Sequence, residues 1–218
     1  MKIQWLGHAS FKIIAQDGTT LITDPYGDSV GKAFPEQKAD IVTCSHYHND
    51  HSNLKAIQGE YELVDSVGAH QAGCFAIEGF ETDHDAEGGK VRGKNIMFKI
   101  SADGFSILHC GDIGHRLTRE MIEAIGKVHV LMVPIGGTYT VDAEGALELC
   151  EEIKPTMIVP MHYKTSDSNY EIEKVEPFIN LMRENEYAIS MLDADFMDLD
   201  PEDFPRRERV VIMNYHEH

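Results

Sequence analysis

Four side chains able to bind metal ions lie within six consecutive residues of the segment CSHYHNDHSNL, at 44–54. His46 and His48 are two positions apart, so in an extended or turning segment both imidazoles can face the same cation. Asp50 and His51 follow where residues 52–57 suggest the start of a helix, and they can face a second cation. A lone histidine at the end of a strand is more often structural, but this density of ligands favours metal binding.

One further histidine for each cation and one shared carboxylate would complete a site for two ions. His84, Asp112 and His162 supply this set, and each follows an apolar segment that predicts a strand. If the ends of these strands meet at one edge of a sheet, the side chains converge there. Taken singly, each could equally be structural, and the other histidines open to the same reading are His70, His109, His115 and His129. We interpret His109 as a buried support residue, because strand alternation points it away from Asp112.

Imidazole and carboxylate ligands suit zinc, manganese or iron, and we expect two divalent ions, zinc before manganese or iron. Two such ions about 3.5 to 4 Å apart share a water molecule and lower its pKa from about 15.7 toward about 7. The same ions polarise the oxygen under attack, so no serine or cysteine nucleophile is needed. The ligand pattern therefore predicts hydrolysis of an ester, lactone, amide or phosphoester by a metal-bridged hydroxide.

Composition restricts the partners of the chain. Its 218 residues, 42% of them hydrophobic, show no linker-like segment, so we expect a single domain over 1–218. The formal charge of −18 disfavours nucleic acid and anionic membranes, although a locally positive site could still hold a small anionic substrate. The N-terminus does not resemble a signal peptide, which predicts a cytoplasmic protein with reduced cysteines that act as small buried apolar residues.

The order of apolar segments predicts two kinds of strand and three helices. Residues 2–16 and 20–25 read as a hairpin-rich start, and 95–112 as two strands joined at 102–104. The continuous apolar runs at 39–46, 128–137 and 155–163 are typical of strands covered on both faces. Helical periodicity covers 117–126, 142–155 and 170–187. A sheet-on-sheet core flanked by helices fits this order, while a doubly wound sheet remains an alternative.

Several motifs resemble the metallo-β-lactamase superfamily, whose HxHxDH signature corresponds to HYHNDH here. The others are WLGHASFKI at 5–13, ITDP at 22–25, HCGDIG at 109–114, VPIGGTYT at 133–140 and VPMHY at 159–163. Together they span residues 1–165 and resemble the branch that contains L-ascorbate-6-phosphate lactonase-like metal-dependent hydrolases. The resemblance implies an α/β fold, the four-layer αββα sandwich, with the metal ions at one edge.

The same resemblance assigns roles to the candidate ligands. His46, His48 and His84 would bind one ion, Asp50, His51 and His162 the other, and Asp112 would bridge them. Asp50 would also orient the water molecule that attacks. The expected contacts to a small-molecule substrate are His8, Arg92, Lys94, Asn95, Thr138, Tyr139 and Lys164, with His8 more readily explained as structural.

Departures from the pattern disfavour three neighbouring branches, and two alternative functions stay open. The chain lacks the long insertion of nucleic-acid-processing members, the C-terminal helical domain of the glyoxalase II type and the flavodoxin domain of diiron reductases. A phosphodiesterase-type member of the same fold and a non-catalytic metal-binding sensor stay open as functions. The sequence leaves homo-oligomerisation open.

Overall fold

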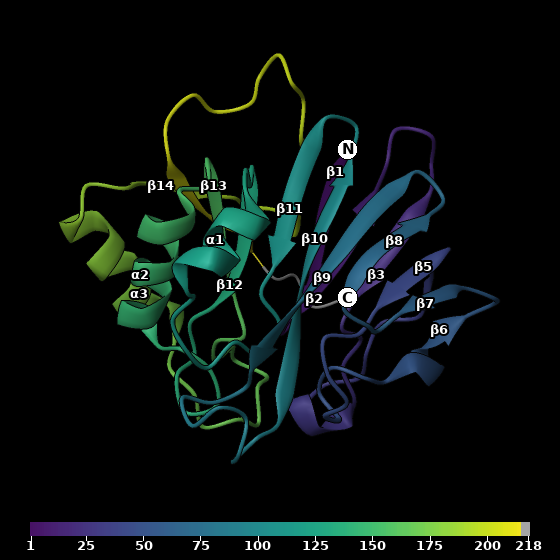
Figure 1. Cartoon of the computed structure of the whole chain (residues 1–218), viewed down its shortest axis with the longest axis horizontal. Helices are drawn as coiled ribbons and strands as arrows, with labels where there is room; N and C mark the ends of the chain where they lie inside the picture. Colours follow the sequence, from purple (N-terminus) through teal and green to yellow (C-terminus); the bar gives the residue numbers. More distant parts are fainter. Residues whose placement is uncertain (215–218) are drawn as a thin grey trace.

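Two β-sheets facing each other form the frame of the computed structural model, which describes residues 1–214 (Figure 1). The six-stranded sheet has the order β15-β1-β2-β3-β5-β7. Its strands are β1 (Lys2–Gly7), β2 (Ser10–Ile14), β3 (Thr20–Thr23), β5 (Ile41–Thr43), β7 (Glu62–Val64) and β15 (Phe196–Asp198). The hairpin-rich start that the sequence predicts is present, because β1, β2 and β3 pair antiparallel in sequence order.

The eight-stranded sheet has the order β14-β16-β13-β12-β11-β10-β9-β8. Its strands are β8 (Gly68–Ala72), β9 (Phe75–Asp83), β10 (Lys94–Ala102), β11 (Phe105–His109), β12 (Val130–Pro134), β13 (Met157–Met161), β14 (Ala188–Met191) and β16 (Arg209–Ile212). Strands β11, β12 and β13 are parallel and every residue in them is buried, as the continuous apolar runs at 128–137 and 155–163 predict for β12 and β13.

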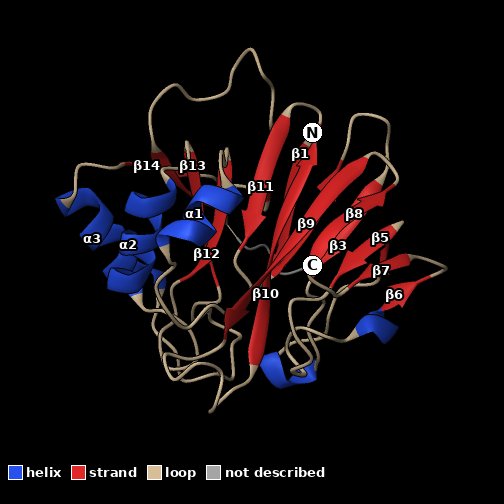
Figure 2. Cartoon of the chain, viewed as in Figure 1, coloured by secondary structure: helices blue, strands red, loops and turns tan. Residues whose placement is uncertain are grey.

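Three α-helices lie together on one side of the eight-stranded sheet (Figure 2). They are α1 (Arg119–Ile125), α2 (Ala143–Ile153) and α3 (Val175–Glu184). The Thr118 and Asp142 side chains accept hydrogen bonds from the backbone N–H groups of Met121 and Gly145, so both act as N-caps. The helices bury their apolar faces with the strands in one large core that both sheets share.

The outer face of the six-stranded sheet has a thinner cover. Leu6, Ile22 and Val42 form a second apolar cluster there with Ile57 and the partly buried Leu54. The cover of this face includes the 3-10 helix η2 (Leu54–Ala56) and a two-stranded sheet of β4 (Gln37–Lys38) and β6 (Ile57–Gln58). A second 3-10 helix, η1 (Asp28–Val30), lies earlier in the chain. The mixed α/β sandwich that the sequence predicts is confirmed, with this layer formed by short elements.

Two predicted helices differ from the structure. The helix expected at 52–57 is only η2, because Ile57 already pairs with Gln37 in the small sheet. The helix expected at 170–187 is only α3, since the Glu173 backbone N–H donates to the Gly136 carbonyl and its carbonyl accepts from Lys164. These bonds hold residues 164–173 as a loop beside the end of β12.

Two further expectations can be compared with the structure. Cys44, Cys110 and Cys150 are buried as expected, but Cys74 is exposed, so the reading of all four as buried apolar residues was wrong. Within residues 1–214, no helix has the length and apolar character needed to cross a membrane.

Candidate metal centre

The ends of strands from both sheets meet at one edge and carry the candidate ligands. Asp24 follows β3 directly, and the HYHNDH segment begins three residues after β5, which pairs parallel with β3. In the other sheet, His84 follows β9 and His162 follows β13, while Asp112 lies three residues beyond β11. The loops are joined across the sheets by the Ile96 backbone N–H, which donates to the Ser45 carbonyl over 2.9 Å.

Asp112 lies at the centre of the site. Its Oδ2 atom is 3.2 Å from Nε2 of His51, 3.2 Å from Nε2 of His84 and 3.3 Å from Nε2 of His162. The Nε2 atom of His46 lies 3.8 Å away. All five side chains are buried, with Asp112 only 1% exposed. The structure thus brings segments from four parts of the chain to one carboxylate oxygen.

Around this carboxylate the other ligands form two groups. His46, His48 and His84 form one, and their ligand atoms lie within 4.8 Å of one another. Asp50, His51 and His162 belong to a second group with the same spacing. The sequence resemblance assigns these same residues to the two ions, and that assignment stays a prediction. His48 is the one exposed histidine of the six residues, so the first group is open to solvent.

His8 joins the second group. Its Nε2 donates to Oδ2 of Asp50 over 3.2 Å, and its ring centroid lies 4.0 Å from that of His162. The backbone at His8 has φ 53°, a conformation that costs energy for a residue with a side chain. The Trp5 indole N–H and the His162 backbone N–H both donate to the His8 carbonyl and hold this turn in place. His8 therefore contacts the second group directly, and its role as a substrate contact stays a prediction.

Unsatisfied buried atoms show that the residues fit a cation. The Nε2 atoms of His46, His51 and His162 and the Oδ1 atom of Asp112 are buried without a hydrogen-bond partner. A buried polar atom without a partner costs about 1–3 kcal/mol. These atoms belong to the two ligand types that zinc, manganese and iron accept, so divalent ions would satisfy them.

Charge and burial shift the pKa values of these groups in opposite directions. Burial lowers the pKa of His46 to about 3 and that of His8 to about 4. For His162, burial opposes protonation, but the Asp112 carboxylate outweighs it and raises the pKa to about 9. The pKa of Asp112 is held well below its usual range because His162 and His51 outweigh the effect of burial. Without metal, protons on His51 and His162 balance the buried carboxylates.

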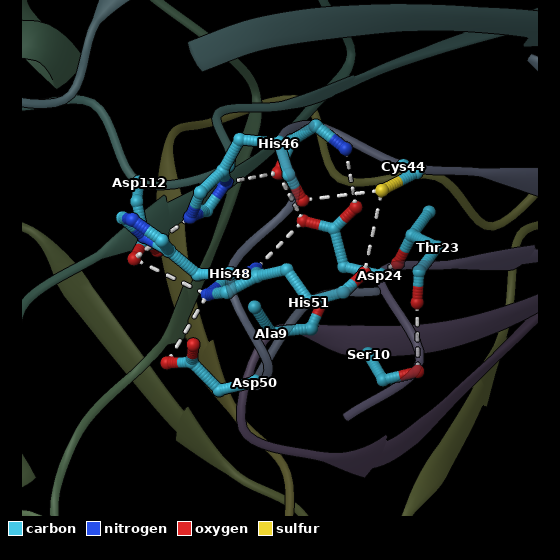
Figure 3. A network of polar contacts seen from close by, with 12 residues as sticks. Ala9, Ser10, Thr23, Asp24, Cys44, His46, His48, Asp50, His51 and Asp112 are labelled. Atoms are coloured by element: carbon cyan, nitrogen blue, oxygen red, sulfur yellow. Dashed lines mark hydrogen bonds and ion pairs between the residues drawn. The ribbon is translucent and has the colours of Figure 1, made fainter. Parts of the chain in front are cut away.

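Asp24 fixes the orientation of one ligand from each group (Figure 3). The Nδ1–H of His51 donates to Oδ2 of Asp24 over 2.9 Å. The Ser45 hydroxyl donates to the same oxygen and accepts from Nδ1–H of His46 over 2.9 Å. Both rings are thereby held with Nε2 toward Asp112. A carboxylate behind a ligand histidine sets its tautomer and raises its basicity. Asp24 belongs to the ITDP motif, but sequence reasoning assigned no role to its side chain.

Asn95 holds the backbone of Asp112 in place through hydrogen bonds. Its Oδ1 accepts from the Asp112 backbone N–H over 2.9 Å, and its amide donates to Thr82 Oγ1 and to the Cys110 carbonyl. Asn95 is 0% exposed, so its prediction as a substrate contact was wrong. Gly111 has φ 53°, and an added Cβ would collide with Asn95 and Ser45.

His109 donates to the Ala9 carbonyl over 2.7 Å and is fully buried, as predicted.

The remaining predicted substrate contacts differ in their charge partners. Lys94 lies 2.7 Å from Asp83 and 3.2 Å from Glu81, so its charge already has two carboxylate partners, and its role as a substrate contact stays a prediction. Lys164 is paired with Glu171 at 2.8 Å. Arg92, Thr138 and Tyr139 contact one another and stay candidate contacts. Sequence reasoning missed Tyr170, whose ring lies 5.7 Å from that of His8.

Comparisons with known proteins agree with this geometry. Residues 2–162 match the family model of the β-lactamase superfamily domain. The chain is 34% identical over 196 residues to a UPF0173 metal-dependent hydrolase of Pelotomaculum thermopropionicum, covering 76% of this chain and 85% of the relative. It is 31% identical over 193 residues to a UPF0173 metal-dependent hydrolase of Thermoplasma acidophilum, covering 77% of this chain and 85% of the relative.

A solved structure shares the whole fold. A Thermotoga maritima protein, described as a Zn-dependent hydrolase of the metallo-β-lactamase superfamily, superposes with a TM-score of 0.80 at 34% identity. The match covers 97% of each chain. The chain therefore belongs to the metallo-β-lactamase superfamily and groups within it with the UPF0173 metal-dependent hydrolases. It is a metal-dependent hydrolase of that superfamily.

Proposed function

We propose that the protein is a dinuclear hydrolase that acts on a small anionic metabolite, either a lactone, an ester or a phosphoester. The observation that carries this proposal is the position of Asp112 Oδ2 between the two ligand groups, at 3.2 Å from both His51 and His84. One carboxylate oxygen shared in this way suits two cations better than one. A resemblance to lactonase-like members supports the lactone among these substrate classes.

The chain supplies ligands for both ions and a means of orienting solvent. His46, His48 and His84 would hold one ion, Asp50, His51 and His162 the other, and Asp112 both. A pair of divalent ions, when bound, lowers the pKa of a shared water molecule and polarises the bond under attack. Asp50 lies within the second group, with its Oδ2 atom 3.6 Å from His51 Nε2 and 3.2 Å from His8 Nε2. Its carboxylate can accept a hydrogen bond from a water molecule held there and so orient it, which gives Asp50 the catalytic role.

The rest of the site keeps these groups in place and in the required protonation state. Asp24 and Ser45 hold the rings of His51 and His46 with their lone pairs toward the ions. Asn95 holds the backbone of Asp112. Because these supports are buried and mutually hydrogen-bonded, little reorganisation is needed when substrate binds.

The test is a screen of metal-loaded protein against matched variants. Metal-free protein is loaded separately with zinc, manganese or iron and assayed with lactones, carboxylic esters, thioesters and phosphoesters. We expect turnover of at least one class and a loss of at least about 100-fold in Asp112→Asn. His70→Ala is the control, because His70 lies on β8 at the edge of the eight-stranded sheet, where its ring nitrogen contacts the Ser66 carbonyl. No turnover with any ion, or full activity in Asp112→Asn, would contradict the proposal.

A further inference from the structure

We propose that Arg92, seated against Tyr139, forms an oxyanion-binding subsite beside the metal centre. It would bind a carboxylate or phosphate group of the substrate that is separate from the bond being hydrolysed. This inference rests on the proposed function for its biological meaning, because it defines which substrates the hydrolase selects. The subsite itself follows from the contacts of the loop that carries Arg92.

The loop between β9 and β10 is held rigid by a buried carboxylate. Asp85 follows the ligand His84 directly, and its side chain accepts four backbone N–H bonds of 2.8 to 2.9 Å, from Glu87, Gly89, Val91 and Arg92. These four bonds fix the backbone of Arg92 relative to the metal ligand His84.

The guanidinium group of Arg92 is also fixed. One of its terminal nitrogens donates to the Thr138 carbonyl over 2.9 Å. Its central carbon lies 5.4 Å from the ring centroid of Tyr139, the geometry of a cation–π contact. Thr138 has φ 53°, so the loop after β12 takes a strained conformation at the point where it meets Arg92. An arginine has five N–H donors. The Thr138 carbonyl accepts from one of them, and the other N–H groups of Arg92 can donate to an oxyanion.

A row of rings connects Arg92 with the metal centre. The Tyr139 ring centroid lies 5.8 Å from that of Tyr170, and the Tyr170 centroid lies 5.7 Å from that of His8. The His8 ring centroid in turn lies 4.0 Å from that of His162. Tyr170 is held by a 3.0 Å hydrogen bond from its hydroxyl to Ser29 Oγ. A substrate with its reacting bond at Asp112 could therefore lie along Tyr170 and Tyr139 and place a distant anionic group at Arg92.

Charge partners distinguish Arg92 from the neighbouring cations. Lys94 is paired with Asp83, and Lys164 with Glu171. Among residues 1–214, no carboxylate lies in ion-pair contact with Arg92, although the chain carries 37 acidic residues against 19 Lys and Arg. A partly buried guanidinium left unpaired in so acidic a protein is suited to bind an anion from solution.

The test compares ligands of equal length that carry one or two carboxylates. Metal-loaded protein is titrated by calorimetry with dicarboxylates from butanedioate to octanedioate and with the monocarboxylate of each length. One carboxylate can approach the ions, and the second can reach Arg92 only at a suitable length. We expect at least one dicarboxylate to bind about tenfold more tightly than its monocarboxylate, which corresponds to about 1.4 kcal/mol. Arg92→Met should abolish this preference and leave the monocarboxylate affinity unchanged.

Two further variants separate anion binding from a structural role of Arg92. Arg92→Lys keeps the charge and should retain part of the preference. Arg116→Met removes an equal charge from an exposed side chain paired with Glu148, and should retain all of it. The subsite is refuted if wild-type protein shows no preference at any length, if Arg92→Met keeps the preference, or if it weakens both ligand series equally.

The outcome of the dicarboxylate titration is independent of whether the proposed hydrolysis is found. If no lactone, ester or phosphoester is hydrolysed, the proposed function fails, while a dicarboxylate preference lost in Arg92→Met still establishes the subsite. If hydrolysis occurs without such a preference, the proposed function stands and the subsite fails.

Discussion

Replacing Asp24 with asparagine should weaken one metal position much more than the other. Asp24 is 0% exposed, its Oδ1 accepts from the Ser45 backbone N–H over 2.8 Å, and its Oδ2 accepts from His51 and the Ser45 hydroxyl. Asparagine has the same shape but one acceptor oxygen. If this oxygen stays on the Ser45 backbone, the amide N–H₂ faces the His51 Nδ1–H, and His51 loses its orienting hydrogen bond.

The size of the effect follows from that single bond. A hydrogen bond to a charged group contributes about 1.5–3 kcal/mol. Loss of such a support behind a metal ligand lowers metal affinity about 10–100-fold. His46 keeps its 2.9 Å hydrogen bond with the Ser45 hydroxyl, which can donate or accept. The ion on the His51 side should therefore bind about 10–100-fold more weakly, while the ion on the His46 side changes far less.

Competition between the metal-free protein and a chromophoric zinc chelator measures the two affinities as two steps. Asp40→Asn is the matched control, because the exposed Asp40 carboxylate accepts two hydrogen bonds from Thr20, of 2.7 and 2.9 Å, at the opposite end of β3. The control should bind both ions as the wild type does. Equal weakening of both steps in Asp24→Asn, or none, would refute the role given to Asp24.

Three other changes test the site. Gly111→Ala should lower the free energy of unfolding in urea by about 1–3 kcal/mol, because the added Cβ collides with Asn95 and Ser45. Gly104→Ala, also at positive φ but with open space around it, should lower that free energy by less, and equal losses in the two variants would contradict this reasoning. Metal binding at pH 7 should release about two protons, measured by calorimetry in buffers of different ionisation enthalpy, because the pKa of His51 is raised well above its usual value and that of His162 to about 9. Metal affinity should then rise with pH toward 9, and release of no protons would contradict the assignment. His8→Ala should weaken binding of one ion about 10-fold or more in the same zinc titration, and unchanged binding of both ions would exclude a role for His8 at the second group.

The strands were predictable where burial is complete. The apolar runs at 128–137 and 155–163 became β12 and β13, which lie between the helices and the other sheet. Strands such as β8 were missed, because only Ala72 is fully buried in its five residues and pairing with β9 determines the strand. The predicted helix at 170–187 was too long because the bond between Glu173 and Gly136 connects two loops far apart in sequence.

Within the site, the proximity of side chains was predictable where the signal is local. Spacing alone placed His46, His48, Asp50 and His51 together. The role of Asp24 depends on the register of β3 and β5, which pairs Thr23 with Thr43 and brings Asp24 to Ser45. No short segment contains that information. Asn95 was misread for the same reason, since the fold buries a polar residue at the start of β10 and uses it to hold the backbone of Asp112.

X-ray absorption spectroscopy on metal-loaded protein, combined with metal analysis, tests the central claim most directly. Two groups of ligands around Asp112 predict two ions per chain, with a metal–metal distance of about 3.5 to 4 Å. In Asp112→Asn, this metal–metal signal should weaken or disappear. A single tightly bound ion per chain, or two ions with no metal–metal scattering in the wild type, would contradict the shared centre.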